Sequence, residues 1–442
     1  MVTSHELTEA LTDADVGIAT SIGKPLAWYD RTNGEIGDIC NQQTGSYTAN
    51  GTTYNIQLEF SNAVSNCVLP PTPPANATAQ ASQVDNATGN LEIYYTGSDA
   101  HIHQWTWNAT NGWFNLDLNL NTGSPNSASS GPVSSIMDTL FPRPEVFYVT
   151  TTNQHVQQFY WDSATGWHTV DLTNATGAPA AANSIKSVTG LMDTVTGRPE
   201  AYYVGTDQHV HQLYFDGTTW HTSDISFVTG APNVASGGNV TSMVNTITNA
   251  PEVWYIGGDQ HVHEIIWNSV TGWATYDLSM QAGAPPAALA GGLTILVDTL
   301  NNRNEAYYIG TDTHVHQLYW VNGVGWFTSD MTNVTGAPAA ASGSGITSLM
   351  DTLTSQLEIY YVASTQHVWQ IGWTAPRGFF TLDVSGTIGA PNAASGTTLT
   401  ALVDSLDSGL EVYYSGSDQH THQLQWTTAN GWRQFDVTTS GH

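Results

Sequence analysis

A short set of polar and aromatic residues recurs along the chain. In five copies an aspartate lies two residues before a His-x-His pair, and a tryptophan follows the second histidine after nine or ten residues. Neutral sugars are bound by an aromatic face, which covers their C–H surface, and by a few fixed polar groups for their hydroxyls. The pattern therefore predicts sugar-binding sites. The candidates are Asp99, His103 and Trp113; Asp207, His211 and Trp220; Asp259, His263 and Trp273; Asp312, His316 and Trp326; and Asp418, His422 and Trp432.

Two further copies depart from this set, and they are expected to be empty or altered. The second copy has Asn153 and Gln157, and the sixth has Thr365, Trp369 and Phe379. Other interpretations stay open: the tryptophan can pack between repeats, the first histidine can be a hydrogen-bonded structural residue, and His-x-His can bind zinc. Seven similar copies speak against catalysis, which needs one asymmetric site.

The first seventy residues carry a different pattern. His5-Glu6-Leu7-Thr8-Glu9 would place His5 and Glu9 on one helix face as metal ligands, with Glu6 as the base beside a metal-bound water. The only cysteines, Cys40 and Cys67, predict one disulfide in an oxidising compartment.

The repeat predicts the fold. Seven glutamates open a tyrosine-rich strand at intervals of 52 to 55 residues, from Glu92 to Glu411. In the fifth copy, residues 293–298, 305–310, 314–320 and 326–330 read as four short strands separated by turn residues. This period predicts an all-β, seven-bladed β-propeller of four-stranded blades over residues 79–438. We expect the ring to close without a strand from the far terminus. A small α+β, disulfide-linked segment (1–69) and a Pro-rich linker (70–78) precede it.

Charge limits the partners. Eight Lys and Arg face 37 Asp and Glu, for a net charge of −29. Because phosphate binding needs clustered bases, nucleic acid is excluded, and no apolar run reaches the roughly 18 residues of a membrane span. The neutral polar composition predicts a secreted protein whose leader is missing from this chain, because Met1 is not followed by a signal-peptide pattern.

The repeat resembles a known lectin family. The segment from Arg198 (RPEAYYVGTDQHVHQLYFDGTTWHTSD) and residues 305–330 are similar to bacterial seven-bladed propeller lectins of the Photorhabdus type. The resemblance covers about 360 residues and implies multivalent, weak binding of fucose or O-methylated sugars on glycans or glycoproteins, without a cofactor. Fungal fucose lectins are more distant in pattern. They place an Arg in the strand where this chain has Glu, so their sugar site is not carried over to this chain.

Residues 4–68 resemble the C-terminal part of the exordium/phosphate-induced family. The resemblance rests on the His-Glu-Leu-x-Glu motif, an Ala-Trp-Tyr segment and residues 35–40 (EIGDIC), and it implies a zinc site with His5 and Glu9 as ligands. Glu35 or Asp38 would be further ligands, and Glu6 a catalytic base. Since only four residues precede His5, we expect a remnant without a substrate cleft and no activity from the chain as it stands. A metallopeptidase-like enzyme with a targeting propeller, a protein-interaction platform and a homo-oligomer stay open.

Overall fold

The computed structural model describes residues 29–30, 34–35, 39–40, 43–49, 52–61, 66–68 and 79–440, apart from 111, 129–130, 183–187 and 290. The chain divides into two compact units, Met1–Pro73 and Pro74–His442, and each is described by itself.

Short antiparallel strand pairs make up the described part of the first unit. They are Tyr29–Asp30 (β1) with Gly34–Glu35 (β2), Thr44–Ala49 (β3) with Thr52–Gln57 (β4), and Glu59–Ser61 (β5) with Asn66–Val68 (β6). Cys40 and Cys67 form a disulfide, which confirms that prediction. The predicted zinc and base residues His5, Glu6, Glu9 and Asp38 lie outside the described residues, and of Glu35 only the backbone is described.

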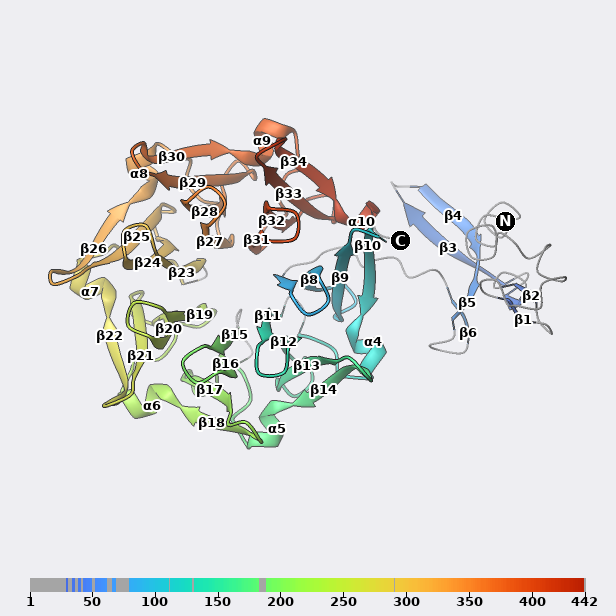
Figure 1. Cartoon of the computed structure of the whole chain (residues 1–442), viewed down its shortest axis with the longest axis horizontal. Coiled ribbons are helices and arrows are strands. Elements are labelled where there is room, and N and C mark those ends of the chain that lie inside the picture. The colour runs from blue at the N-terminus through green and yellow to red at the C-terminus, as the bar shows by residue number, and fades with distance from the viewer. Residues whose placement is uncertain are drawn as a thin grey trace. The chain divides into compact units, whose positions relative to one another are not determined.

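The second unit is a ring of seven four-stranded antiparallel sheets (Figure 1), which confirms the predicted propeller. Blade 1 contains Gln80–Asp85 (β7), Asn90–Thr96 (β8), Ile102–Asn108 (β9) and Gly112–Asp117 (β10); blade 2 contains Val133–Asp138 (β11), Arg143–Val149 (β12), Val156–Asp162 (β13) and Gly166–Asp171 (β14). Blade 3 contains Val188–Asp193 (β15), Arg198–Val204 (β16), Val210–Phe215 (β17) and Trp220–Asp224 (β18); blade 4 contains Val240–Asn245 (β19), Ala250–Ile256 (β20), Val262–Asn268 (β21) and Gly272–Asp277 (β22). Blade 5 contains Leu293–Asp298 (β23), Arg303–Ile309 (β24), Val315–Val321 (β25) and Gly325–Asp330 (β26). Blade 6 contains Ile346–Asp351 (β27), Gln356–Val362 (β28), Val368–Thr374 (β29) and Gly378–Asp383 (β30); blade 7 contains Leu399–Asp404 (β31), Gly409–Ser415 (β32), Thr421–Thr427 (β33) and Gly431–Asp436 (β34).

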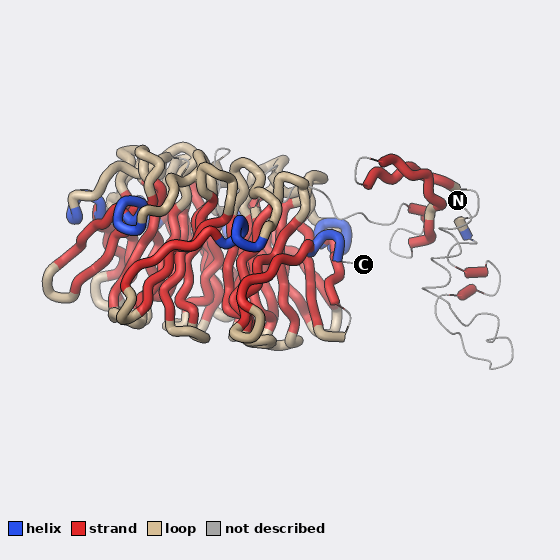
Figure 2. Tube along the Cα trace, turned by 90° about the horizontal axis from the view of Figure 1, so that it is seen from above, coloured by secondary structure: helices blue, strands red, loops and turns tan. Residues whose placement is uncertain are grey.

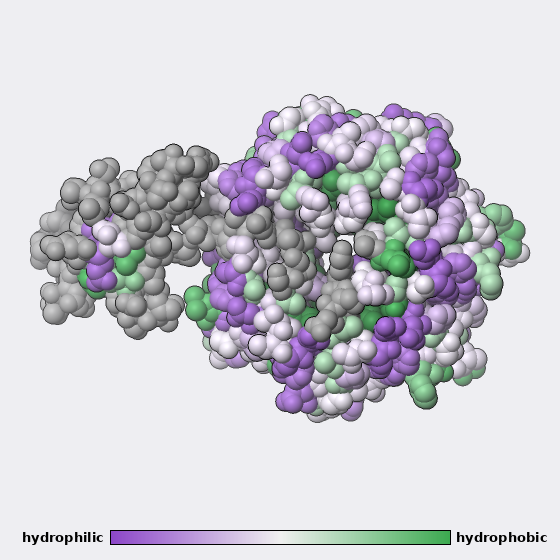
Figure 3. Space-filling model, turned by 180° about the vertical axis from the view of Figure 1, so that it is seen from behind, coloured by the Kyte–Doolittle hydropathy of each residue, from purple (hydrophilic) through white to green (hydrophobic). Residues whose placement is uncertain are grey.

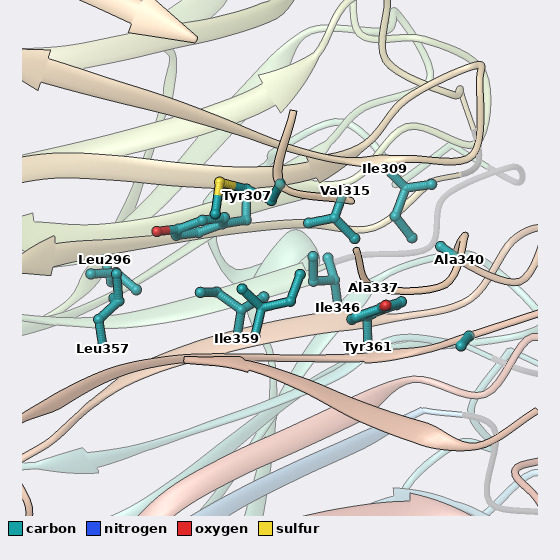
Figure 4. Close-up of a cluster of buried hydrophobic side chains, with 13 residues drawn as sticks. Leu296, Tyr307, Ile309, Val315, Ala337, Ala340, Ile346, Leu357, Ile359 and Tyr361 are labelled. Carbon is teal, nitrogen blue, oxygen red and sulfur yellow. The ribbon is translucent and has the colours of Figure 1, made fainter. Parts of the chain in front are cut away.

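The hydrophobic core lies between neighbouring blades. The second strand of every blade is almost completely buried, because both of its faces are covered by adjacent sheets. Figure 4 shows one such cluster, in which Leu296 and Tyr307 of blade 5 face Leu357, Ile359 and Tyr361 of blade 6. Burial of this apolar area, at about 25 cal/mol per Å², is the main force that holds each blade against the next.

Blades 7 and 1 meet without a borrowed strand, as the sequence predicts. All four strands of blade 1 come from one continuous stretch, β7 to β10. The Gln80 side-chain amide donates to the Ser415 hydroxyl at 2.8 Å, and the Ser82 and Thr400 hydroxyls lie 2.8 Å apart. The innermost strands surround an axial channel of about 330 Å³ that is lined by Ser and Thr together with Val, Leu and Ile residues. Side-chain hydrogen bonds and packing therefore close the ring.

A short helix follows the last strand of every blade at the outer rim of the ring (Figures 1 and 2). These helices are Leu118–Thr122 (α4), Leu172–Thr176 (α5), Ile225–Thr229 (α6), Leu278–Ala282 (α7), Met331–Thr335 (α8), Val384–Ile388 (α9) and Val437–Ser440 (α10). The sequence predicts the aspartates that precede them but not the helices, because five residues are too few for a helical period to show. Within the described residues no helix has the length and apolar character needed to cross a membrane.

Candidate functional site

The second histidine of each pair is held by the turn aspartate. In blades 1, 3, 4, 5 and 7 the His Nε2 lies 3.0–3.2 Å from an Asp carboxylate oxygen. In blade 5 the ring of His316 stacks on Tyr308 with centroids 5.3 Å apart, and the side chain of His316 is only 1% exposed. Partial burial raises the pKa of Asp312, but hydrogen bonds from His316 and from the His314 amide outweigh it and lower the pKa below its usual value. These contacts stabilise the turn and leave little of the imidazole for a ligand.

The first histidine serves a helix cap. In all seven blades its Nδ1 lies 2.6–2.8 Å from the aspartate that ends the last strand. In blade 5, Asp330 also accepts the Asn333 amide of α8 at 2.9 Å, so one carboxylate caps the helix and holds His314. The hydrogen bond to Asp330 raises the pKa of His314. The structural interpretation of the first histidine is confirmed.

The hairpin tryptophan lies at the other end of its strand from the Asp–His pair. In blade 5, His316 pairs with Asp330, whereas Trp326 pairs with Trp320, four residues further along β25. At about 3.3 Å per residue this separates the two groups by about 13 Å, more than one sugar ring can span. The predicted grouping of Asp, His and Trp around one sugar is therefore corrected. The spacing in sequence crosses a hairpin, and the residue that returns beside His316 is Asp330.

Each hairpin tryptophan contacts an aromatic ring of the preceding blade. Trp326 meets Trp254 of blade 4 with centroids 5.4 Å apart, and Trp113 meets Tyr413 of blade 7 at 6.4 Å across the ring closure. The same contact recurs as Trp167–Tyr94, Trp220–Phe147, Trp273–Tyr202 and Trp432–Tyr360. The packing interpretation of the tryptophan is therefore confirmed, and it also places the ring at the junction between two blades.

Pockets lined by described residues lie at three of these junctions. They lie between blades 7 and 1 (about 300 Å³), blades 1 and 2 (about 140 Å³) and blades 4 and 5 (about 380 Å³). The later blade provides two tryptophans, one from the third strand and one from the hairpin. The earlier blade provides the buried strand-two glutamate and the polar residue of strand three. The tryptophan pairs are Trp107 with Trp113, Trp161 with Trp167, and Trp320 with Trp326.

The strand-two glutamate is a buried hydrogen-bonded acid in every blade. Glu92 accepts hydrogen bonds from Tyr94 at 2.5 Å, Gln83 at 3.1 Å and Gln104 at 2.8 Å. Burial raises the pKa of Glu92 to about 7, although these hydrogen bonds oppose the shift. The sequence signal for its role was its presence in all seven copies, but spacing alone could not show that it borders a pocket with the next blade.

Comparison with known proteins places the chain in a family. The sequence model of the fungal fucose-specific lectins matches residues 46–253 and 226–440. The chain belongs to the fungal fucose-specific lectin family. Its relatives include the fucose-specific lectin of Aspergillus fumigatus, which is 23% identical over 247 residues, or 54% of this chain and 74% of the relative.

Solved structures of lectins share the fold of this family member. The BP39L lectin of Burkholderia pseudomallei superposes with a TM-score of 0.61 at 11% identity, over 81% of this chain and 98% of that lectin. The six-bladed propeller of the Aleuria aurantia lectin has a TM-score of 0.50 at 14% identity, over 83% of this chain and 96% of that lectin. The family match shows membership of the fungal family, which the sequence pattern ranked as more distant, and the Photorhabdus-type likeness stays a prediction. None of these matches bears out the exordium-like resemblance, and the family match begins at residue 46, within the stretch assigned to it.

Proposed function

We propose that the protein is a multivalent lectin that binds fucose and related neutral sugars in the pockets between blades. The observation that carries the proposal is the pairing, at one junction, of a tryptophan wall with buried polar side chains. In the pocket between blades 7 and 1, Trp107 and Trp113 face Glu411 and Gln423. A sugar can rest its C–H face on the indoles while its hydroxyls exchange hydrogen bonds with the polar side.

The relatives support fucose as the ligand. The Aspergillus fumigatus relative is named a fucose-specific lectin, and the matching family is that of the fungal fucose-specific lectins. Strand two has Glu92 and its equivalents where the fungal fucose lectins have Arg. The carboxyl group accepts hydrogen bonds from sugar hydroxyls, whereas an Arg donates them, so the orientation of the sugar is expected to differ.

Several shallow pockets suit avidity. Single sites of this kind bind weakly, and linked sites raise the overall affinity by roughly 10²–10⁴ on a surface that presents many sugars. On the coloured part of the face shown in Figure 3, hydrophobic residues form small patches between larger hydrophilic areas. A broad apolar patch would mark a protein-binding platform, so that alternative ranks second.

A titration of the full chain with α-methyl fucoside, combined with a glycan array, tests the proposal. Trp107→Ala should remove one fucose site, because it takes away one wall of the pocket between blades 7 and 1. The matched control is Asp99→Ala in the same blade, which changes the turn at the opposite strand end and should leave every fucose site intact. If Asp99→Ala removes a site and Trp107→Ala does not, the pocket assignment is wrong. If no glycan binds even in multivalent format, the interaction-platform alternative takes its place.

Three narrower expectations complete the proposal. O-methylated sugars and the Photorhabdus-type grouping rest on the repeat motif of residues 198–224, and a secreted location rests on the composition. Zinc at His5 and Glu9 rests on the spacing of the His5–Glu9 motif and on the exordium-like resemblance. Elemental analysis of the purified full chain tests it, since a bound zinc would appear at one equivalent and none would dismiss the metallopeptidase alternative.

A further inference from the structure

The pocket between blades 4 and 5 differs chemically from its equivalents. Strand three has Gln at the position before its hydrophobic core residue in six blades but Glu264 in blade 4. Asn245 of blade 4 stands where the other six blades have Asp. Asn304 of blade 5 stands where the other six blades have Leu or Pro. All three exceptions line this one pocket. The six Gln are Gln104, Gln158, Gln212, Gln317, Gln370 and Gln423.

Glu252 and Glu264 form a buried carboxyl pair at the base of the pocket. Glu252 is 0% exposed and Glu264 5%. Glu252 accepts hydrogen bonds from Asn245 at 2.7 Å, Asn304 at 2.8 Å and the Trp254 indole at 3.2 Å, all of them neutral donors. Burial, together with the neighbouring charge of Glu252, raises the pKa of Glu264 well above its usual value. Within the pair, Glu264 is the hydrogen-bond donor and Glu252 the acceptor. The Glu264 proton takes the place of the Gln N–H that strand three supplies to the strand-two glutamate in blades 1, 2, 3 and 5.

The pocket is rich in hydrogen-bond acceptors that a ligand could use. The Oδ1 of Asn304, in a side chain that is 6% exposed, is buried without a hydrogen-bond partner, since the amide nitrogen of Asn304 is taken by Glu252. Among the described residues that line the pocket there is no Lys or Arg, and Tyr276 is the only titratable side chain besides the two glutamates. In blades 2 and 5, by contrast, Arg143 and Arg303 neutralise the strand-two glutamate.

We propose that the pocket between blades 4 and 5 binds an amino sugar through its ammonium group. An ammonium carries three N–H donors and one positive charge, which match the carboxyl pair and the open Asn304 oxygen. Trp320 and Trp326, with centroids 5.6 Å apart, supply the wall for the sugar ring and a cation–π contribution. The bound ammonium replaces the proton of Glu264, which passes to solvent. The inference rests on the proposed function only in using the pocket between blades as the sugar site.

Titration of the full chain at pH 6 with glucosamine, N-acetylglucosamine and glucose tests the inference, because the three share a ring and differ at one substituent. Glucosamine should bind at one site, at least tenfold more tightly than the other two, with release of a proton. Glu264→Gln installs the residue of the other six blades and should lower the glucosamine affinity at least tenfold without lowering the melting temperature. Asn304→Leu, which copies blades 1, 6 and 7, should weaken it as well.

Each other outcome is decisive. Glucosamine affinity that survives Glu264→Gln, or that equals the affinity for glucose, would overturn the inference. If n-butylamine binds as tightly as glucosamine, the pocket recognises an ammonium group without a sugar ring, and the inference is also overturned. Fucose is titrated on the same sample. Wild-type protein that binds fucose but not glucosamine contradicts only this inference, whereas binding of glucosamine alone contradicts only the proposed fucose sites.

Discussion

The tryptophan rings at the blade junctions have two roles, since they pack the blades together and line the pockets between them. Trp326 packs on Trp254 of the preceding blade and lines the pocket between blades 4 and 5. Trp326→Ala should therefore remove binding at that pocket and also destabilise the propeller by about 3–5 kcal/mol, as large-to-small core substitutions do. Thermal melting and sugar titration on the same sample check both effects. Trp326→Phe keeps an aromatic wall and should lose less sugar binding and less stability than Trp326→Ala. Full stability in Trp326→Ala would contradict the packing role.

Arg303 balances the charge of a buried glutamate. Arg303 lies 4.6 Å from the centroid of Tyr319 and forms an ion pair with Glu305, which is fully buried. Arg303→Met leaves that carboxylate without a positive partner and should destabilise the protein by about 3 kcal/mol at pH 8, with a smaller loss at pH 5, where Glu305 takes up a proton. Urea unfolding at both pH values measures the difference.

The matched control for this experiment is in blade 3. Arg198 is exposed and forms no ion pair with Glu200 among the described contacts, so Arg198→Met should change the unfolding free energy by about 0.5 kcal/mol or less. Equal losses in the two variants would show that the Arg303–Glu305 pair makes no special contribution.

What the sequence predicts at this scale is the type of residue, not its partner. The tryptophans and glutamates stand out because they recur, and internal copies act as their own comparison. The predicted grouping was wrong because Trp326 pairs with Trp320, at the far end of the hairpin from His316. Trp326 instead lines a pocket with Glu252 of the preceding blade, which is seventy-four residues away in the sequence. Contacts within one hairpin follow from period-two alternation and register, but contacts between blades depend on how the sheets twist and stack, and no short-range pattern encodes that.

At the scale of elements, the strand-end aspartates join three parts of each blade. Asp330 ends β26, caps α8 through the Asn333 amide and accepts a hydrogen bond from His314. Asp330→Ala should lower the free energy of unfolding by about 1 kcal/mol through loss of the helix cap. Loss of the hydrogen bond to His314 should lower it further. Asp330→Asn is the discriminating control, because Asn is an equally good cap without the charge. Thermal melting should rank wild type first, then Asn, then Ala, and an Ala variant as stable as wild type would contradict the capping role.

The strands of the propeller follow almost directly from the sequence, because each is a β-branched and aromatic run between turn residues. The short helices do not, since α8 spans only Met331–Thr335 and has no apolar stripe of its own. Tertiary position explains them: Asp330 supplies the start, and Gly336, at φ 70°, supplies the left-handed residue that ends the helix.

At the scale of the whole molecule, the disulfide should act on one unit only. Cys40 and Cys67 are 27 residues apart within Met1–Pro73, whereas all seven blades lie in Pro74–His442. The chain-entropy estimate for such a loop is about 3.5 kcal/mol. Calorimetry before and after reduction should shift a transition of the first unit and leave the propeller transition in place. A drop in the propeller transition on reduction would contradict this independence.

The seven buried glutamates give the propeller a common response to pH. Burial raises the pKa of Glu92, Glu145, Glu200, Glu305 and Glu358 to about 7 and that of Glu411 to about 8, from an ordinary value of 4.5. Between these values the folded state binds protons that the unfolded state has lost, so the free energy of unfolding falls as the pH rises. The contribution is complete below about pH 4.5 and is lost as the pH passes through 7 to 8.

The aspartates of the turns and helix caps lower the stability of the propeller at acidic pH, opposite to the effect of the glutamates. Hydrogen bonds from His side chains and backbone amides outweigh burial and lower the pKa values of Asp99, Asp207, Asp259, Asp312, Asp330 and Asp436. Their stabilising contribution is present above their ordinary pKa of 3.8 and is lost as the pH falls below it. The melting temperature of the propeller should therefore be highest near pH 5 and lower at both pH 8 and pH 3. Glu358→Gln removes one of the buried acids and should reduce the loss between pH 5 and 8, whereas a melting temperature that rises from pH 5 to 8 would contradict the assignment of protonated glutamates at the blade junctions.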